Sequence, residues 1–159
     1  MFLLGGMGCD TPYLEGSLGQ LLDLTYTEAR VQLSPEDVAV FFTKNRASDA
    51  LADGGVAATN FDIQFQVSMA LWDAGVEPGV KMDLTVQDAS GTQRGQFTRQ
   101  VLNDPRTSFP KAERAELFFD RVPVVGQPVS GNFHVTFENG VETASGRTVF
   151  GSFDVKGVK

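Results

Sequence analysis

The side chains that could carry chemistry in this chain are few, and the first is its single histidine, His134. It falls within 129–137, where the apolar residues occupy odd positions and His134 shares the even positions with Asn132 and Thr136. A strand with this alternation places the even positions on its solvent face. A histidine base needs a nucleophile beside it, and no Gly-x-Ser-x-Gly elbow marks a serine for that role. We therefore interpret His134 as a surface residue and assign no catalytic residue.

The acidic residues offer a second kind of chemistry, because clustered carboxylates bind calcium and paired carboxylates hydrolyse glycosides. Asp83 and Asp88 flank an expected hairpin, and Asp104 lies in a loop. No EF-hand loop is present, and isolated loop acids commonly bond to nearby backbone amides. Zinc would need more Cys and His ligands than Cys9 and His134 supply. We predict no metal, no cofactor and no enzymatic activity. A small hydrolase, with acids gathered around His134 or Asp104, is the alternative.

Cys9 is the only cysteine, and it lies in the stretch "FLLGGMGCD", residues 2–10. One cysteine cannot form an internal disulfide. The stretch resembles the end of a bacterial lipoprotein signal peptide, with residues 2–4 as the remnant of an apolar core and Gly6-Met7-Gly8-Cys9 as the lipobox. Gly6 stands where leucine is usual and no Lys or Arg precedes the apolar residues, so the signal looks truncated. The resemblance implies that Cys9 becomes the first mature residue and carries lipid on its sulfur.

The same resemblance, to bacterial envelope lipoproteins, implies how the chain is organised and where it works. Residues 1–9 are the signal remnant and lipobox, 10–18 are a tether rich in turn-forming residues, and 19–159 are the folded domain. A diacylglycerol group and a further acyl chain would anchor the protein stably to a membrane. We expect an extracytoplasmic protein on the outer membrane or the periplasmic face. It would be a non-enzymatic interaction or structural module whose partners are envelope proteins or glycans.

Exposed aromatic residues support a different function, the binding of a glycan or another small ligand. The ligand would be bound by loops at one end of the sandwich, or by exposed Trp72, Tyr13 or Tyr26 acting as stacking platforms. The 13 phenylalanines fall mostly on core-facing positions and are expected to pack the interior.

Composition limits the partners and the architecture. The chain has 159 residues, which favours a single domain. Lys and Arg total 13 against 20 Asp and Glu, so the net charge is -7. A polyanion would be repelled, and we predict no nucleic-acid partner. After position 10 no apolar run approaches the roughly 18 residues that a membrane-spanning helix needs.

Period-two alternation between turn-forming clusters predicts an all-β fold. The expected architecture is an antiparallel two-sheet β-sandwich of immunoglobulin-like type, with an eight-stranded β-barrel as the alternative. The clearest strand is 61–69, whose odd positions are apolar. Residues 81–87 and 93–103 are expected to form a hairpin whose second arm is an edge strand or contains a bulge. Further strands are expected at 22–33, at 38–42 in preference to a helix, and at 116–122.

The pattern of residues in the last quarter of the chain predicts two strands and also how they pair. Residues 129–137 form a strand with its odd positions in the core, and Asn139-Gly140 favours a tight turn after it. That turn would place Val149, Phe153 and Val155 on the wrong face. We therefore predict a bulge around Gly146, or a longer loop with the same effect on register.

Overall fold

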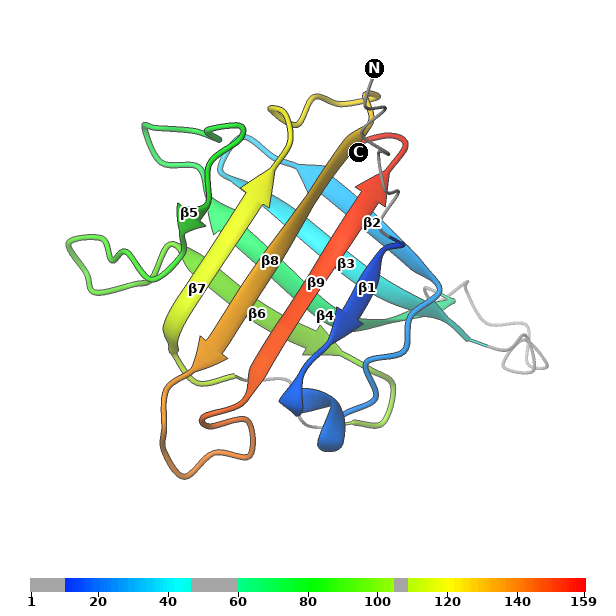
Figure 1. Ribbon diagram of the computed structural model, residues 1–159, viewed down its shortest axis with the longest axis vertical. Helices are drawn as coiled ribbons and strands as arrows, with labels where there is room; N and C mark the ends of the chain where they lie inside the picture. Colours follow the sequence, from blue (N-terminus) through cyan, green and yellow to red (C-terminus); the bar gives the residue numbers. More distant parts are fainter. Residues whose placement is uncertain (1–10, 47–59, 105–108) are drawn as a thin grey trace, which may run out of the picture.

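Two antiparallel β-sheets pack face to face in the computed structural model, which describes residues 11–46, 60–104 and 109–159 (Figure 1). One sheet has the strand order β1-β9-β8-β7-β5 and the other β2-β3-β4-β6. Among the described residues there is one short 3₁₀ helix, η1, and no helix of the length and apolarity needed to cross a membrane. The elements are β1 (Tyr13–Glu15), η1 (Ser17–Gln20), β2 (Glu28–Leu33), β3 (Asp37–Asn45), β4 (Phe61–Ala70), β5 (Met82–Asp83), β6 (Gly95–Gln100), β7 (Ala112–Phe119), β8 (Val129–Phe137) and β9 (Thr148–Val155).

The predicted all-β sandwich is confirmed, and the two sheets are not closed into the alternative barrel. The strand order nevertheless differs from that of an immunoglobulin domain, in which the second strand pairs with the fifth. Here β2 pairs with β3, and both β2-β3-β4 and β7-β8-β9 are meanders of neighbouring strands. The sheets are therefore built mainly from hairpins between consecutive strands.

The core lies between the sheets and is rich in phenylalanine, as the alternation predicts. In β8 the odd positions 129, 133, 135 and 137 are all buried. Residues 38–42 lie in β3, so the preference for a strand over a helix is confirmed. The strand expected at 116–122 is β7, which begins and ends earlier in the chain. The buried phenylalanines are Phe42, Phe65, Phe97, Phe119, Phe133, Phe137 and Phe153.

A bulge interrupts β4, and it corrects the expectation that every odd position of 61–69 faces the core. Phe42 of β3 pairs with Phe65, but the next residue, Thr43, pairs with Ile63, so Gln64 is the extra residue. One extra residue reverses the faces of everything before it. Phe61 and Ile63 are consequently only half-buried, whereas Phe65 is fully buried.

The hairpin expected from 81–87 and 93–103 forms only at its tip. Gln87 and Gln93 make an isolated antiparallel bridge, and the Arg94 amide donates to the Val86 carbonyl at 2.7 Å. Beyond the tip the two arms separate, because β5 pairs with β7 in one sheet while β6 pairs with β4 in the other. β6 is the last strand of its sheet, which confirms the predicted edge strand.

The β8–β9 connection is the longer loop rather than a tight turn at Asn139-Gly140. Residues 138–147 join the strands, and Val135 pairs with Val149 while Gly131 pairs with Phe153. This register returns Val149, Phe153 and Val155 to the core, as predicted. The loop has a different number of residues from the predicted one, but the same alternate residues of β9 face the core.

The segment 10–18, expected to be a tether, is largely part of the sandwich from Tyr13 onward. Tyr13–Glu15 forms β1 and pairs with β9, and Ser17 begins η1. Leu14 and Leu18 are buried in the core. Both leucines belong to the hydrophobic core cluster, so their burial holds this segment against the sandwich. Cys9 and Asp10 lie outside the described residues, so the fold does not test the expectations for them.

Candidate functional site

The outer face of the five-stranded sheet carries a row of rings from three strands. Tyr13 of β1 meets Phe150 of β9 edge to face, with ring centroids 6.1 Å apart, and His134 of β8 stacks on the other side of Phe150 at 6.3 Å. Tyr13 is 39% exposed, and the other two rings are half-buried. The sequence predicted Tyr13 as a stacking residue and His134 as a residue of the outer face, but it did not predict that they share a neighbour. We call these three residues the aromatic row.

Charged side chains border the aromatic row on the β7 side. Glu116 pairs with His134 across the sheet and lies 3.5 Å from Arg114 and 3.9 Å from Lys81. Burial lowers the pKa of His134 below its usual 6.5, and the positive charge of Arg114 lowers it further. The imidazole is therefore neutral at pH 7. Its partners across the sheet are a carboxylate and a phenyl ring, so the expected surface role fits its position.

Trp72, the second predicted stacking residue, lies away from the aromatic row, in the turn after β4. It is 43% exposed and has a φ of 38°, which is rare for a bulky side chain. The guanidinium of Arg94 lies 5.6 Å from the centre of the indole and donates to the carbonyls of Ala70 and Gly75. Arg94 therefore holds both the turn and the ring, which is a structural role.

Tyr26, the third predicted stacking residue, is half-buried before β2. Its ring packs edge to face on Phe42, with 5.1 Å between centroids, and burial raises its pKa. One side of it lines a hollow of about 480 Å³ bordered also by Leu14 and Leu22. The three predicted aromatic residues thus occupy separate places and form no common platform.

Two of the three acids singled out in the sequence, Asp83 and Asp88, bind neighbouring backbone, as their isolation suggested. Asp83 accepts hydrogen bonds from the amide and hydroxyl of Thr85, and Asp88 accepts the amides of Ser90 and Thr92. Asp104 lies 3.5 Å from the guanidinium of Arg99. Within the described parts of the chain, no three His, Cys, Asp or Glu side chains come together as metal ligands.

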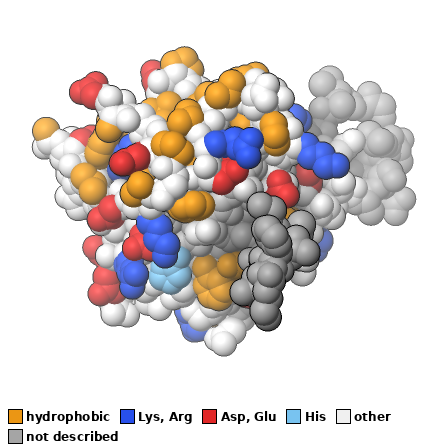
Figure 2. Space-filling view, turned by 45° about the horizontal axis from the view of Figure 1, so that its top comes forward, with side chains coloured by type: hydrophobic (Ala, Val, Ile, Leu, Met, Phe, Trp, Pro, Cys, Tyr) orange, Lys and Arg blue, Asp and Glu red, His pale blue; other side chains and the backbone are white. Residues whose placement is uncertain are grey.

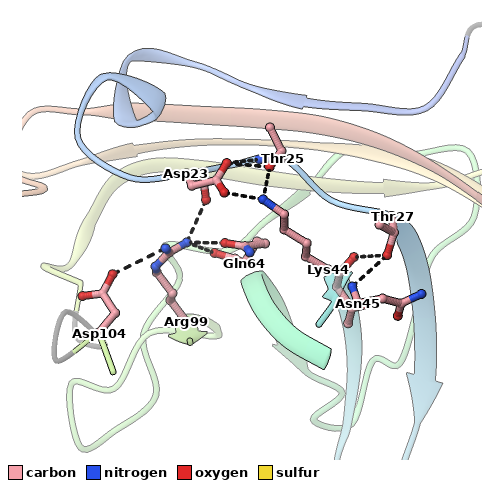
Figure 3. A network of polar contacts seen from close by, with 9 residues as sticks. Asp23, Thr25, Thr27, Lys44, Asn45, Gln64, Arg99 and Asp104 are labelled. Atoms are coloured by element: carbon pink, nitrogen blue, oxygen red, sulfur yellow. Dashed lines mark hydrogen bonds and ion pairs between the residues drawn. The ribbon is translucent and has the colours of Figure 1, made fainter. Parts of the chain in front are cut away.

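Arg99 is a buried charged residue that was not predicted from the sequence. It lies in β6 with 4% exposure, and it points inward on the same face as Phe97. Its Nη1 donates to the Asp23 carbonyl at 2.9 Å and to both the carbonyl and Oε1 of Gln64, at 3.0 and 2.9 Å (Figure 3). The one local signal of an inward side chain is that Arg99 shares the odd positions of its strand with Phe97. Arginine is otherwise typical of exposed positions, so burial was not expected. These contacts join β6, the β4 bulge and the loop before β2.

A second part of this polar network lies nearer the surface. Lys44 of β3 donates to Asp23 at 2.6 Å and to the Thr25 hydroxyl at 2.7 Å, and Thr25 donates from its amide to Asp23 (Figure 3). These hydrogen bonds, with that to Lys44 the largest, lower the pKa of Asp23 well below its usual 3.8. These hydrogen bonds fix the path of the chain as it enters β2. Each of the three side chains bonds to another part of the fold.

Two further hollows lie on the surface of the described residues. One of about 540 Å³ lies between β6 and residues 109–111, with Phe97 and Phe109 in its wall. The other, of about 210 Å³, lies on the outer face of the four-stranded sheet and is lined by Phe41, Phe61 and Ile63 beneath Arg30. The bulge at Gln64 produces this last apolar surface by turning Phe61 and Ile63 outward.

Comparison with protein family models, with curated proteins and with solved structures finds no match for this chain.

Proposed function

We propose that this protein is a lipid-anchored module of a bacterial cell envelope, held outside the cytoplasm through Cys9, and that it works by binding rather than by catalysis. The observation that carries the proposal is the lipobox-like Gly6-Met7-Gly8-Cys9 just before a folded domain. The first strand begins at Tyr13, four residues after Cys9. A lipid on Cys9 would therefore hold the sandwich directly against a membrane.

The partners of the chemically capable side chains support a binding role. His134 lies between Phe150 and Glu116, and Asp83 and Asp88 are engaged by their own turns. General acid–base catalysis requires such groups to converge on a reacting atom. Among the described residues His134, Asp83 and Asp88 lie on separate strands and loops, and each contacts a neighbour in the fold.

Mass spectrometry of the protein purified from its native membranes tests the anchor. We expect Cys9 to be the first residue of the mature chain, with the added mass of a diacylglycerol and an acyl group. A Cys9→Ala variant should lack the modification and leave the membrane fraction. A native protein with an unmodified Cys9, found entirely in the soluble fraction, would refute the proposal.

The aromatic row favours a second candidate function, recognition of a glycan of the envelope. Sugar rings stack on aromatic faces, and Asn132 and Ser152 lie next to the row on the same sheet. The affinity for purified cell-wall glycan fragments, measured by titration, should be lower in the Tyr13→Ala and Phe150→Ala variants. Trp72→Ala is the matched control, because Trp72 is about as exposed as Tyr13 but lies away from the aromatic row. Equal binding by all three variants would exclude the row as the binding site.

A further inference from the structure

The loop between β7 and β8 exposes several apolar side chains. Val122, Val124 and Val125 are 47, 52 and 62% exposed, and residues 122–128 carry no charge. In the neighbouring loop Val80 is 42% exposed, and the adjacent Gly79 amide donates to the Phe119 carbonyl at the end of β7. Hydrophobic side chains gather over the end of the molecule that comes forward in Figure 2. We call Val80, Val122, Val124 and Val125 the valine patch.

The loop holds its valines outward through fixed backbone contacts. The Gln127 amide closes a turn on the Val124 carbonyl at 3.0 Å, and Gly126 has the positive φ, 81°, that this turn requires. The Gly126 amide donates to Val158 at 2.8 Å, and the Val158 amide donates to Gln127 at 3.0 Å. The exposure is therefore a property of the folded backbone, and the valines cannot turn inward without breaking these bonds.

The valine patch lies at the end of the sandwich where the chain enters its first strand. β1 runs antiparallel to β9, with Tyr13 opposite Ser152, and β9 ends beside the first residue of β8, Val129 (Figure 1). Four residue steps from Tyr13 to Cys9 span at most about 14 Å. The three residues from Ser152 to Val155 rise about 10 Å toward the same end. A lipid on Cys9 would thus hold the membrane surface close to the level of the loop.

We propose that the valine patch docks on the membrane that carries the lipid anchor and inserts Val124 and Val125 into its interfacial region. This inference rests on the proposed anchor at Cys9. A lipid surface is the occupant that the short spacer brings to this end of the molecule. The exposed valines gain free energy by leaving water there, and residues 122–128 have no charge that would have to be desolvated. At the base of the loop the charges of Asp120 and Arg121 pair with each other at 3.0 Å.

In the test, a lipid anchor is attached to Cys9 by chemical coupling. Because Cys9 is the only cysteine, its thiol can be coupled to a maleimide phospholipid in phosphatidylcholine vesicles whose acyl chains carry bromine. Val124→Trp and Val141→Trp are prepared in a Trp72→Phe chain, so that each has one tryptophan. Val141 is fully exposed in the 138–147 loop at the opposite end of the sandwich, which makes it the matched control. Circular dichroism verifies that both variants fold.

The Val124→Trp chain should lose about half of its fluorescence to the bromolipid, because an interfacial side chain lies close to the acyl chains. Its emission should also move to shorter wavelength, while that of Val141→Trp stays unchanged. If the fluorescence of Val124→Trp is not quenched, the proposal is wrong, and a protein partner becomes the occupant of the patch to test. This outcome is separate from the failure of the anchor itself, which mass spectrometry of native Cys9 would show.

Discussion

Arg99 donates two hydrogen bonds to Gln64, one to its carbonyl at 3.0 Å and one to its side-chain oxygen at 2.9 Å. Gln64 is the residue that the pairing of β3 with β4 skips. The buried guanidinium therefore satisfies the polar groups of a bulge inside the sandwich, where water cannot replace it. The same bulge turns Phe61 and Ile63 to the outer face, so one buried charge and one apolar surface have a common origin.

The first prediction concerns Arg99. Arg99→Met should lower the free energy of unfolding by about 3 kcal/mol, because it leaves the Gln64 side chain and the Asp23 carbonyl without their donor. Urea denaturation measures the change. Arg121→Met is the control, since Arg121 has a side chain 60% exposed and an ion pair at the surface. Similar losses in both variants would show that Arg99 contributes no more than a surface cation.

The second prediction concerns Gly131, which lies between β7 and β9 and against the ring of Phe153. A Cβ there would collide with the Phe118 carbonyl and lie 2.6 Å from Cζ of Phe153. Gly131→Ala should therefore destabilise the fold by about 3 kcal/mol through overpacking. In Gly157→Ala the added methyl group meets nothing within 4 Å, and the change should stay within about 0.5 kcal/mol. Equal melting temperatures for the two variants would contradict the tight packing at Gly131.

The β8–β9 hairpin illustrates how far alternation predicts this fold. The alternation of residues 129–137 gives the strand and its buried face correctly. It also demands that Val149 face the core, which fixes the parity of the register. It does not specify how many residues form the loop, because loops of different length with the same parity satisfy the same pattern. Asn139-Gly140 favours a tight turn locally, but the pairing of Val135 with Val149 prevails.

The candidate site was less predictable than the fold, for a physical reason. Tyr13 was recognisable by its type, but its contact with Phe150 depends on the pairing of β1 with β9, which are far apart in the sequence. The burial of Arg99 depends in turn on the bulge at Gln64 and on the loop that contains Asp23. Local patterns show which residues could face inward, and only the assembled sheets bring these partners together.

The third prediction is a pH dependence at Asp23. Its folded pKa lies below the usual 3.8, so the pair with Lys44 stabilises the fold above that pH and is lost as the pH falls further. Both side chains are well exposed, at 48 and 40%, which limits the contribution to about 0.5 kcal/mol. Asp23→Asn should be less stable than the parent at pH 7 and equal to it near the acid limit of folding. A difference that does not change with pH in urea denaturation would contradict this assignment.

The fourth prediction concerns the protonation of His134 in the aromatic row. Burial against Phe150 and the charge of Arg114 lower its pKa, while Glu116 raises it. In an NMR titration the imidazole should therefore titrate below 6.5. Arg114→Gln should raise the pKa and Glu116→Gln should lower it. Phe150→Ala should raise it most, because desolvation is the largest cause of the shift.

The sign of the linked stability follows from the same shift. The unfolded chain binds the proton of His134 more tightly than the folded chain, so the neutral ring favours folding above pH 6.5. This contribution decreases as the pH falls from 6.5 through the lower folded pKa. Because the ring is neutral at pH 7, it can stack on a ligand without desolvating a charge. Opposite shifts in Arg114→Gln and Glu116→Gln would support this arrangement of charges, and a shift of the same sign in both would contradict it.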